Sequence, residues 1–322
     1  MKSKMRVIVD CDAGADDAMA LFLLLAGDAN KEIDILAVTC VSGNTGVQNV
    51  KINVLRTLQA ANRLDIPVFV GADGPLIPPA PTGETSPGYY GYDGFGDADL
   101  PDVPDVSLIK GENAIEYLNR ITNEKKGQIS LICLGPLTNV ALAIRTYKQF
   151  AQNLKDIFIM GGNYRGVGNS TSAAEFNFYF DPEAAQIVLS SIQCPITIVP
   201  WEASLETRLS LEWRFEVLGK LTTPQVQLLN TVERSLHQKK KKKPTQWSAS
   251  DSLVVAVFLR PSLISKSHKC HLSVELHGHG TRGQAIVDHL QKNDHNSTII
   301  ESVNCDMFKE LLLWAAGMEC FK

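Results

Sequence analysis

The chain lacks the features that mark membrane, secreted and nucleic-acid-binding proteins. None of its apolar runs reaches the roughly 20 residues needed to cross a bilayer. Residues 1–6 lead directly into a strand-like run and contain no apolar signal-peptide core, so we expect a cytoplasmic protein. The net charge of −4 gives no indication of nucleic acid or a membrane surface as a partner.

The sequence also lacks paired-cysteine motifs and metal-ligand spacing of its histidines. Its seven cysteines include no CxxC pair, and an odd, scattered set in a chain without a signal predicts reduced thiols. Its histidines show no HExxH spacing. These absences argue against a disulfide scaffold and against a zinc protease of the HExxH type.

What the sequence does contain is a dense cluster of acids near its start. Asp10, Asp12, Asp16 and Asp17 fall within eight residues, after the apolar run 7–9 and before a long apolar stretch. Such runs are typical of strands buried on both faces of a parallel sheet, so we expect the acids where a strand turns into a helix. Crowded carboxylates repel one another, and a helix N-terminus or a hard divalent cation would relieve the repulsion.

The acid cluster also has a purely structural interpretation. Asp16 or Asp17 could cap the following helix, and Asp and Gly favour turns. Capping and turn formation account for only two of the four acids. Because ligands of α/β proteins bind at strand-end loops, we predict a metal or catalytic site here.

The pattern along the chain predicts an α/β fold in a single domain over residues 1–322. Strand-like runs lie at 5–10, 34–41, 67–70, 128–134, 156–160 and 195–199, and helix-like runs between them at 16–27, 46–63, 111–124, 137–147 and 182–191. Further helices are expected near 210–219, 224–238, 251–259 and 306–316, and short strands near 271–277, 284–288 and 298–303. This alternation predicts βαβ units in an open, mostly parallel sheet with helices on both faces.

Two loops stand out. The first, residues 72–106, is rich in Pro, Gly, Tyr and Asp, and a loop of that length in a compact domain is functional or disordered. The second contains five consecutive lysines, Lys239 to Lys243, which we interpret as a solvated, self-repelling loop.

Polar residues follow several of the expected strands. They are Ser42-Gly43-Asn44, the run from Leu134 to Asn139, Gly161-Gly162-Asn163 with Asn169 and Ala174-Glu175-Phe176-Asn177 after it, and Ser250-Asp251 at the start of a helix. Each has a local explanation as a turn or a cap. Parallel strands nevertheless end at one edge of the sheet, so most of these residues are expected to converge there. None of the clusters is a GxGxxG or GxxxxGK loop, and together they suit a hydroxyl-rich small molecule such as a sugar better than a nucleoside triphosphate.

In this order and spacing, the motifs resemble those of the inosine-uridine preferring nucleoside hydrolases, calcium-dependent enzymes with a single Rossmann-like domain. Asp10-Cys11-Asp12-Ala13-Gly14-Ala15-Asp16-Asp17-Ala18 is similar to their DxDxGxDDA start, and Gly135-Pro136-Leu137-Thr138-Asn139 to their G(G/P)LTN segment. Met160-Gly161-Gly162, Ala174-Glu175-Phe176-Asn177 and Asp181-Pro182-Glu183-Ala184-Ala185 are similar to their MGG…AEFN…DPEAA block. The resemblance spans essentially the whole chain.

The resemblance implies a role for each of these residues. It implies that Ca²⁺ is held by Asp12, Asp17, Asp251 and the backbone carbonyl of Leu134. Asp16 would be the general base. The ribose hydroxyls would be held by Asn44, Asn169, Glu175 and Asn177. Asp10 would support the loop without binding the metal. The implied reaction is hydrolysis of the N-glycosidic bond of a ribonucleoside to base and ribose, in which Asp16 activates a calcium-bound water and the transition state resembles an oxocarbenium ion. Relatives form homodimers or homotetramers, so we expect an oligomer.

The chain departs from this family on the side of the leaving base. Many members carry a His immediately before the last metal-binding Asp, where this chain has Ser250, and an HGxDG segment where it has Tyr90-Gly91-Tyr92-Asp93-Gly94. Tyr90, Tyr92 and Trp247 are candidates for stacking on the base or donating a hydrogen bond to it, although all three could serve only in packing. His237 is a weaker candidate acid, and we interpret it as a surface histidine. The base preference stays open.

Two other hypotheses remain. A phosphohydrolase of the haloacid dehalogenase type also begins with DxD after a strand, but Gly14 and the adjacent Asp16 and Asp17 fit it poorly. A non-catalytic relative could bind a ribosyl ligand without turnover, and the missing His supports that hypothesis. The intact set of acids and amides argues against it.

Overall fold

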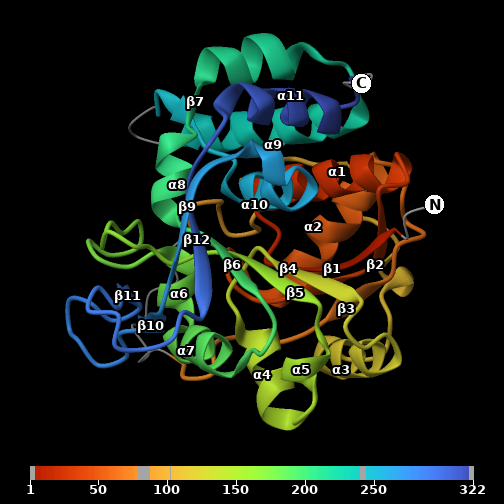
Figure 1. Cartoon of the computed structure of the whole chain (residues 1–322). Helices are drawn as coiled ribbons and strands as arrows, with labels where there is room; N and C mark the ends of the chain where they lie inside the picture. Colours follow the sequence, from red (N-terminus) through yellow and green to blue (C-terminus); the bar gives the residue numbers. More distant parts are fainter. Residues whose placement is uncertain (1–3, 79–87, 102, 240–243, 319–322) are drawn as a thin grey trace.

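The computed structural model describes residues 4–78, 88–101, 103–239 and 244–318. Its centre is an eight-stranded sheet (Figure 1). In spatial order the strands are β3 (Val68–Val70), β2 (Ile33–Cys40), β1 (Met5–Cys11), β4 (Ile129–Cys133), β5 (Asp156–Met160), β6 (Ile196–Val199), β12 (Ser297–Val303) and β9 (Ile264–Cys270). Neighbouring strands run parallel except β9, which pairs antiparallel with β12. The predicted mostly parallel α/β sheet is confirmed.

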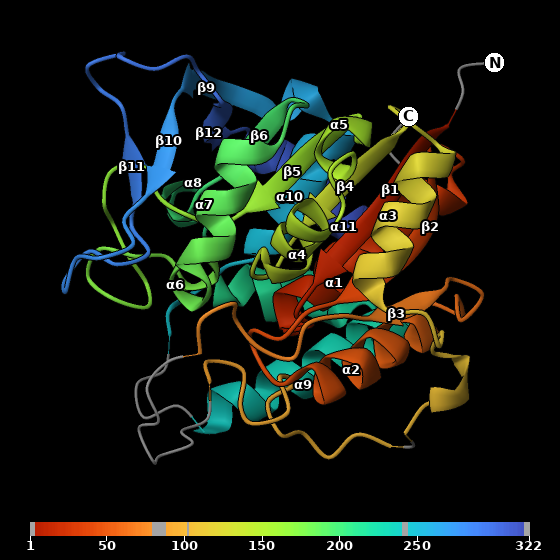
Figure 2. The same cartoon turned by 90° about the horizontal axis from the view of Figure 1, so that it is seen from below.

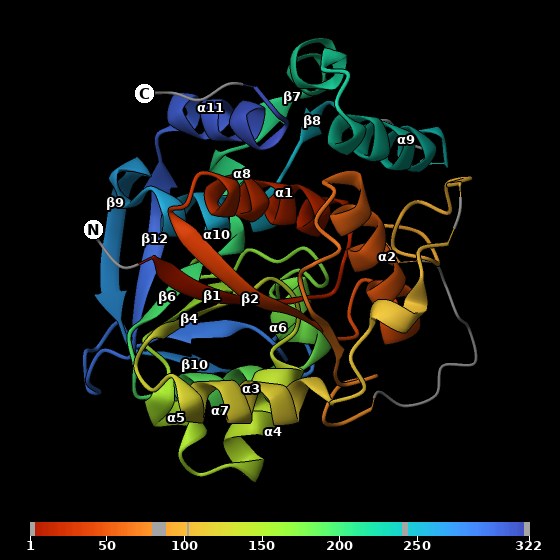
Figure 3. The ribbon, with the colours of Figure 1, turned by 90° about the vertical axis from the view of Figure 1, so that its right-hand side faces the viewer.

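Helices cover both faces of this sheet (Figures 1 and 3). One layer consists of α1 (Ala15–Ala29), α2 (Val47–Ala60), α9 (Pro224–Lys239), α10 (Ser250–Leu259) and α11 (Cys305–Ala315). The other consists of α3 (Ala114–Glu124), α4 (Thr138–Thr146), α5 (Phe150–Asn153) and α7 (Pro182–Ser191). Each layer packs its apolar side chains into its own core, one on either side of the strands. The central strands are therefore buried on both faces, and β1 has a continuous apolar run because neither face alternates with solvent.

Short elements complete the chain. They are η1 (Val106–Leu108), α6 (Phe176–Phe180), α8 (Trp201–Glu206), η2 (Trp213–Val217), η3 (Leu218–Lys220), η4 (Pro261–Leu263), and two small antiparallel pairs, β7 (Leu209–Ser210) with β8 (Gln246–Trp247) and β10 (Leu272–Val274) with β11 (Ala285–Val287). The β10–β11 hairpin packs against α7, apart from the main sheet (Figure 2). Among the described residues, no helix is long and apolar enough to span a bilayer, and no disulfide links the cysteines.

The predicted elements agree with the observed ones in type, apart from the helix expected near 210–219. The helix expected near 210–219 is wrong at its start, because Ser210 pairs with Gln246 in a strand and helical turns begin only afterwards, as a π-helix. The edge strand β9 was not predicted. Its run of Ser, Lys and His side chains faces solvent on the outer side, so it has none of the apolar pattern that indicates a buried strand. Lysines 240–243 and residues 79–87 of the long loop lie outside the described residues.

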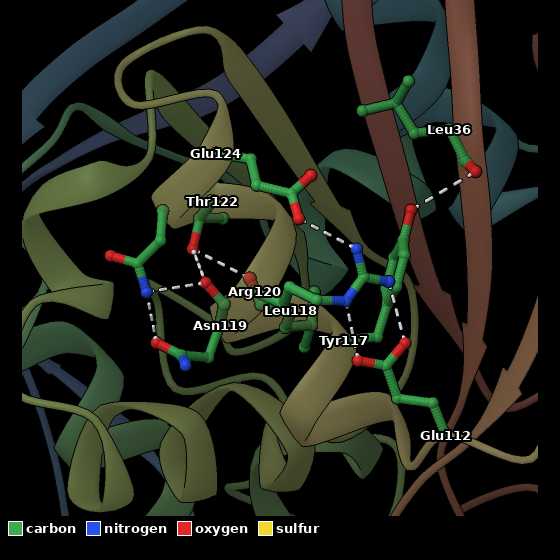
Figure 4. A network of polar contacts seen from close by, with 9 residues as sticks. Leu36, Glu112, Tyr117, Leu118, Asn119, Arg120, Thr122 and Glu124 are labelled. Atoms are coloured by element: carbon green, nitrogen blue, oxygen red, sulfur yellow. Dashed lines mark hydrogen bonds and ion pairs between the residues drawn. The ribbon is translucent and has the colours of Figure 1, made fainter.

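A network of polar contacts surrounds α3, and one of its hydrogen bonds reaches the sheet (Figure 4). Arg120 forms ion pairs with Glu112 at 2.8 Å and Glu124 at 3.1 Å, and the Tyr117 hydroxyl donates to the carbonyl of Leu36 on β2 at 3.3 Å. Because the arginine and its partners are largely exposed, these pairs contribute little to stability. The apolar face of α3 therefore does most to hold it in place.

The order of the strands locates the ligand crevice. Strands β3-β2-β1 run outward in one direction from the centre and β4-β5-β6 in the other, so the order reverses between β1 and β4. Open α/β sheets bind ligands outside the carboxyl ends of the strands at such a reversal. Asp12 directly follows β1, and Leu134 directly follows β4.

Candidate active site

Three carboxylates meet at the reversal of strand order. Asp16 and Asp17 lie in the first turn of α1 and Asp251 in the first turn of α10, and one oxygen of each lies within 4.8 Å of the others. The two helices pack side by side, so their positive N-terminal ends both face the cluster. Burial raises the pKa of Asp251 well above its ordinary value, and repulsion from Asp16 and Asp17 adds to this. Burial likewise raises the pKa of Asp17 to about 7.

Asp12 lies between two glycines that leave room for its carboxylate. A Cβ on Gly43 would come within 2.2 Å of Asp12 Oδ2, and one on Gly135 within 2.9 Å of its Cγ. The backbone N–H of Asn44 donates to Asp12 Oδ2 at 2.7 Å. Burial raises the pKa of Asp12 well above its usual range, as does the charge of Asp17. The loops after β1, β2 and β4 thus converge on one carboxylate.

Asp10 lies apart from this cluster and ties three elements together. Its Oδ1 accepts from Thr39 Oγ1 at 2.6 Å and from Asn139 Nδ2 at 2.7 Å. Asn139 also donates to the carbonyl of Cys40 at 3.0 Å and accepts from the N–H of Ala72 at 2.8 Å. Burial raises the pKa of Asp10 to about 7. These contacts agree with the supporting role expected for Asp10.

Removal of the Asn139 side chain should destabilise the fold more than it impairs the chemistry. Asn139→Ala removes one of the two hydrogen bonds to Asp10 Oδ1 and one of the two to the Cys40 carbonyl, and it leaves the N–H of Ala72 without its partner. We expect the free energy of unfolding to fall by about 3 kcal/mol. Urea unfolding monitored by circular dichroism measures this change. Asn293→Ala, an exposed amide bonded to Asp288, is the control and should shift the free energy of unfolding by less than about 0.5 kcal/mol. Equal stability of the two variants would contradict the structural role.

The donor set of the cluster suits a hard cation. Asp16 Oδ1 and Asp17 Oδ1 are buried and have no hydrogen-bond partner in the part of the chain that the structure describes. Buried carboxylate oxygens are costly without a partner, and every nearby candidate ligand is an oxygen. The carbonyl of Leu134 accepts one hydrogen bond, from Asn177 Nδ2 at 2.7 Å, and keeps a second lone pair.

A cavity of about 620 Å³ opens onto these acids. The predicted site residues that line it are Asp16, Asn44, Tyr90, Leu134, Asn169, Glu175, Asn177 and Asp251. They come from loops and helix starts that are up to 235 residues apart in sequence, from Asp16 to Asp251. The predicted convergence of the polar clusters on one edge is therefore confirmed.

The amides and the acid that were predicted to bind ribose are held by the backbone around them. Glu175 caps α6, accepting from the N–H of Asn177 at 2.9 Å and from that of Gly162 at 2.8 Å. Burial raises its pKa to about 7. Asn177 Nδ2 also donates to the carbonyl of Met160 at 3.1 Å. Because these side chains are already fixed, a ligand would lose little free energy in ordering them.

Comparison with known proteins decides the family. The family model described as "Inosine-uridine preferring nucleoside hydrolase" matches residues 7–310. The chain belongs to this family. It is a ribonucleoside N-glycosidase of a metal-dependent hydrolase family, as its motifs predicted, and the phosphohydrolase hypothesis is wrong.

Relatives of this nucleoside hydrolase match it along nearly its whole length. An uncharacterized protein of Schizosaccharomyces pombe is 35% identical, over 97% of this chain and 99% of its own. The pyrimidine-specific ribonucleoside hydrolase RihA of Photobacterium profundum is 33% identical, over 95% and 96%. Among solved structures, an inosine-guanosine nucleoside hydrolase superposes with a TM-score of 0.87 at 30% identity, over 98% of this chain and 99% of that one.

Tyr90 lies beside the acids of the nucleoside hydrolase site. Its hydroxyl is within hydrogen-bonding reach of the Asp16 carboxylate, and its ring meets that of Tyr89 edge-on at 4.9 Å. Burial raises the pKa of Tyr90 well above its ordinary value, so the phenol stays a neutral donor. Tyr92, by contrast, is 60% exposed and does not line the cavity.

Trp247 lies behind Asp16 and not in the main cavity. It lines a small chamber of about 40 Å³ together with Asp16, Tyr90 and His237. Its indole N–H donates to Glu233 at 2.9 Å, so that donor is already engaged. His237 is half-buried and lines this chamber.

The sequence interpretation missed several residues that line the nucleoside hydrolase cavity. They are Phe176, Trp201, Arg208, Gln246 and Ser248. Phe176 lies inside the motif 174–177, of which only Glu175 and Asn177 were predicted as site residues. Trp201 and Arg208 begin and follow the short helix α8, and neither carries a local pattern that could have marked it.

Proposed function

We propose that this nucleoside hydrolase releases free base and ribose with Ca²⁺ in the acid cluster and Asp16 as general base. The observation that carries the proposal is the single cavity that joins the acid cluster to the ribose-side residues Asn169, Glu175 and Asn177. One end offers negative charge for a cation, and the other offers amides and an acid for hydroxyls. A ribose between them would place its anomeric carbon next to Asp16.

The proposed cation ligands are Asp12, Asp17, Asp251 and the carbonyl of Leu134. Their support is the crowding itself, because burial and mutual repulsion raise the pKa values of the three carboxylates. When bound, Ca²⁺ would supply the positive charge that neutralises them, takes up the ribose diol and makes a nearby water more acidic. The flexible shell of Ca²⁺ suits a mixture of carboxylates and a carbonyl better than the strict octahedron of Mg²⁺ does.

Asp16 would accept the proton of the attacking water. Its Oδ1 has no partner among the described residues, while Tyr90 can hold the carboxylate in place from the other side. The same negative charge stabilises the oxocarbenium-like transition state, in which positive charge develops on the sugar. Because attack and departure occur on opposite faces of the ring, a single displacement predicts inversion at the anomeric carbon.

Asn44, Asn169, Glu175 and Asn177 would bind the ribose hydroxyls. Asn44 Nδ2 lies 3.4 Å from Asp17 Oδ2, at the cation end of the cavity. Glu175 and Asn177 are buried and fixed by α6. Tyr90 lies where a base could contact it, and Trp247 supports the wall behind Asp16. The proposed cytoplasmic location is supported by the scattered cysteines, which include no CxxC pair. The proposed homodimer or homotetramer rests on the family resemblance, and light scattering on purified protein measures the oligomer.

The proposal is tested by measuring free ribose from a panel of purine and pyrimidine ribonucleosides, with Ca²⁺ or with a chelator. We expect ribose release from at least one nucleoside with Ca²⁺ and none with the chelator. Binding of a nucleoside without any ribose release would overturn the proposal in favour of a non-catalytic relative. The relatives' names point both to pyrimidine and to inosine-guanosine substrates, so the panel must cover both classes.

A further inference from the structure

We propose that Arg208 binds the departing base, stabilises the negative charge that it acquires, and favours 6-oxopurine nucleosides as substrates. The inference rests on the proposed function, because it assigns a residue to the half of the reaction that the acid cluster leaves open. Arg208 lies between α8 and β7 and lines the substrate cavity.

Arg208 is a cation without an acidic partner among the residues that the structure describes. Its guanidinium carbon lies 5.4 Å from the ring centre of Trp201, which also lines the cavity. In the described part of the chain it forms no ion pair or hydrogen bond, and it is the one Lys, Arg or His in the cavity lining. Stacking on an aromatic ring orients a guanidinium while leaving its N–H groups free to bind a ligand.

The pairing of β7 with β8 places Arg208 opposite Ser248 in the cavity wall. Leu209 pairs with Trp247 in an antiparallel register, so the next residues, Arg208 and Ser248, lie across from each other. Ser248 Oγ is 3.2 Å from Ser250 Oγ, and Ser250 immediately precedes Asp251. Arg208 is thus near the wall where Ser250 stands in place of a general acid.

The reaction needs a group at this wall that stabilises the negative charge of the departing base. When the bond between C1′ and the base nitrogen breaks, its electron pair goes to the base, while water oxygen forms the new bond to C1′. The departing base is then an anion until it takes a proton from solvent, and the proton accepted by Asp16 returns to solvent, so one water is consumed. A guanidinium stays protonated and cannot donate that proton, but it can stabilise the anion electrostatically.

The same geometry discriminates between bases. A 6-oxopurine presents O6 and N7 as two adjacent acceptors, which match the forked N–H donors of arginine. Adenine presents an amino donor in place of O6, so one N–H of the guanidinium would face another donor. Arg208 should therefore favour inosine and guanosine over adenosine.

The decisive experiment compares Arg208→Ala with the wild-type enzyme on three substrates, inosine, adenosine and p-nitrophenyl riboside. The nitrophenolate is a stable anion that needs no help to depart. We expect kcat/KM for inosine to fall by about 100-fold, while adenosine and p-nitrophenyl riboside stay near the wild-type values. Arg208→Lys should keep part of the rate with inosine but lose the preference for inosine over adenosine. An ammonium lacks the planar, forked pair of N–H donors that a guanidinium has.

Arg165→Ala is the matched control. Its guanidinium also lies over an aromatic ring, 4.9 Å from the centre of Tyr164, but it does not line the substrate cavity. This variant should leave all three substrates unaffected.

Three results would overturn the assignment of Arg208. The first is an equal fall in the kcat/KM of Arg208→Ala for inosine and for p-nitrophenyl riboside. The second is an unchanged kcat/KM of this variant for inosine, and the third is a wild-type enzyme that prefers adenosine to inosine. A fourth is faster cleavage of inosine 5′-monophosphate than of inosine, lost in Arg208→Ala, because the arginine would then bind a phosphate. A wild-type enzyme that releases no ribose from any of these substrates would instead overturn the proposed function itself.

Discussion

Asp16→Asn is expected to lower kcat by about 10³-fold with little change in KM, because an amide cannot accept the proton of the attacking water. The substitution keeps the shape of the side chain and a carbonyl oxygen that Tyr90 can reach. It also removes one negative charge from a buried cluster in which Asp16 raises the pKa values of Asp17 and Asp251. In the absence of Ca²⁺ the variant should therefore unfold at a higher urea concentration than the wild-type enzyme does.

The gain in stability and the loss in rate are measured on the same preparation. Ribose release gives kcat and KM, and urea unfolding in chelator gives the stability. Asp28→Asn, the same substitution on the same helix but in an ion pair with Arg63 away from the cavity, is the control and should leave kcat unchanged. A normal rate in Asp16→Asn would disprove the assignment of Asp16 as general base.

Removal of Ca²⁺ is expected to abolish ribose release and to make the stability of the protein fall as the pH rises from about 4 to about 7. Without a cation, burial raises the pKa values of Asp10 and Asp17 from 3.8 in a free side chain to about 7. At a pH between these two pKa values, the folded protein keeps protons on Asp10 and Asp17 that the unfolded chain has already released. Each such group therefore lowers the free energy of unfolding by about 1.4 kcal/mol per pH unit.

Bound Ca²⁺ should remove the part of this pH dependence that comes from Asp17, because it replaces the protons on the clustered carboxylates, whereas the part that comes from Asp10 should remain. Urea unfolding at pH 5, 6 and 7, in chelator and in Ca²⁺, measures both slopes. Restoring the chelated enzyme with Ca²⁺ or with Mg²⁺ then tests which metal the site prefers. The cation assignment would be contradicted by full activity in chelator, or by equal stability at pH 7 with and without Ca²⁺.

The residues of the candidate site that could be predicted all lie in short, contiguous motifs. Asp12, Asp16 and Asp17 follow one apolar run and precede another, so their place at the end of β1 and the start of α1 is evident locally. The amides after β2 and β5 could be placed on the same edge because parallel strands share one direction. The resemblance to a family then supplied their roles.

The residues that could not be predicted act through partners far away in the chain. Asn139 lies in a recognised motif, but its bond to Asp10 spans 129 residues. Trp247 was one candidate for contact with the base, and its N–H instead donates to Glu233 on α9, 14 residues away in the chain. The start of the helix expected near 210–219 became a strand only because Gln246 lies beside Ser210.

The sequence by itself determined the fold class, the acid cluster and the family, since each of these is written in local apolar periodicity or in short motifs. The tertiary structure alone decided which carboxylates meet, what supports Asp10, and that Arg208 faces the cavity beside Ser248 and Ser250. The physical reason is that burial and repulsion depend on groups brought together by folding. An exposed arginine on a short loop has no pattern of its own, and the pairing of β7 with β8 brings it opposite Ser248 at the cavity.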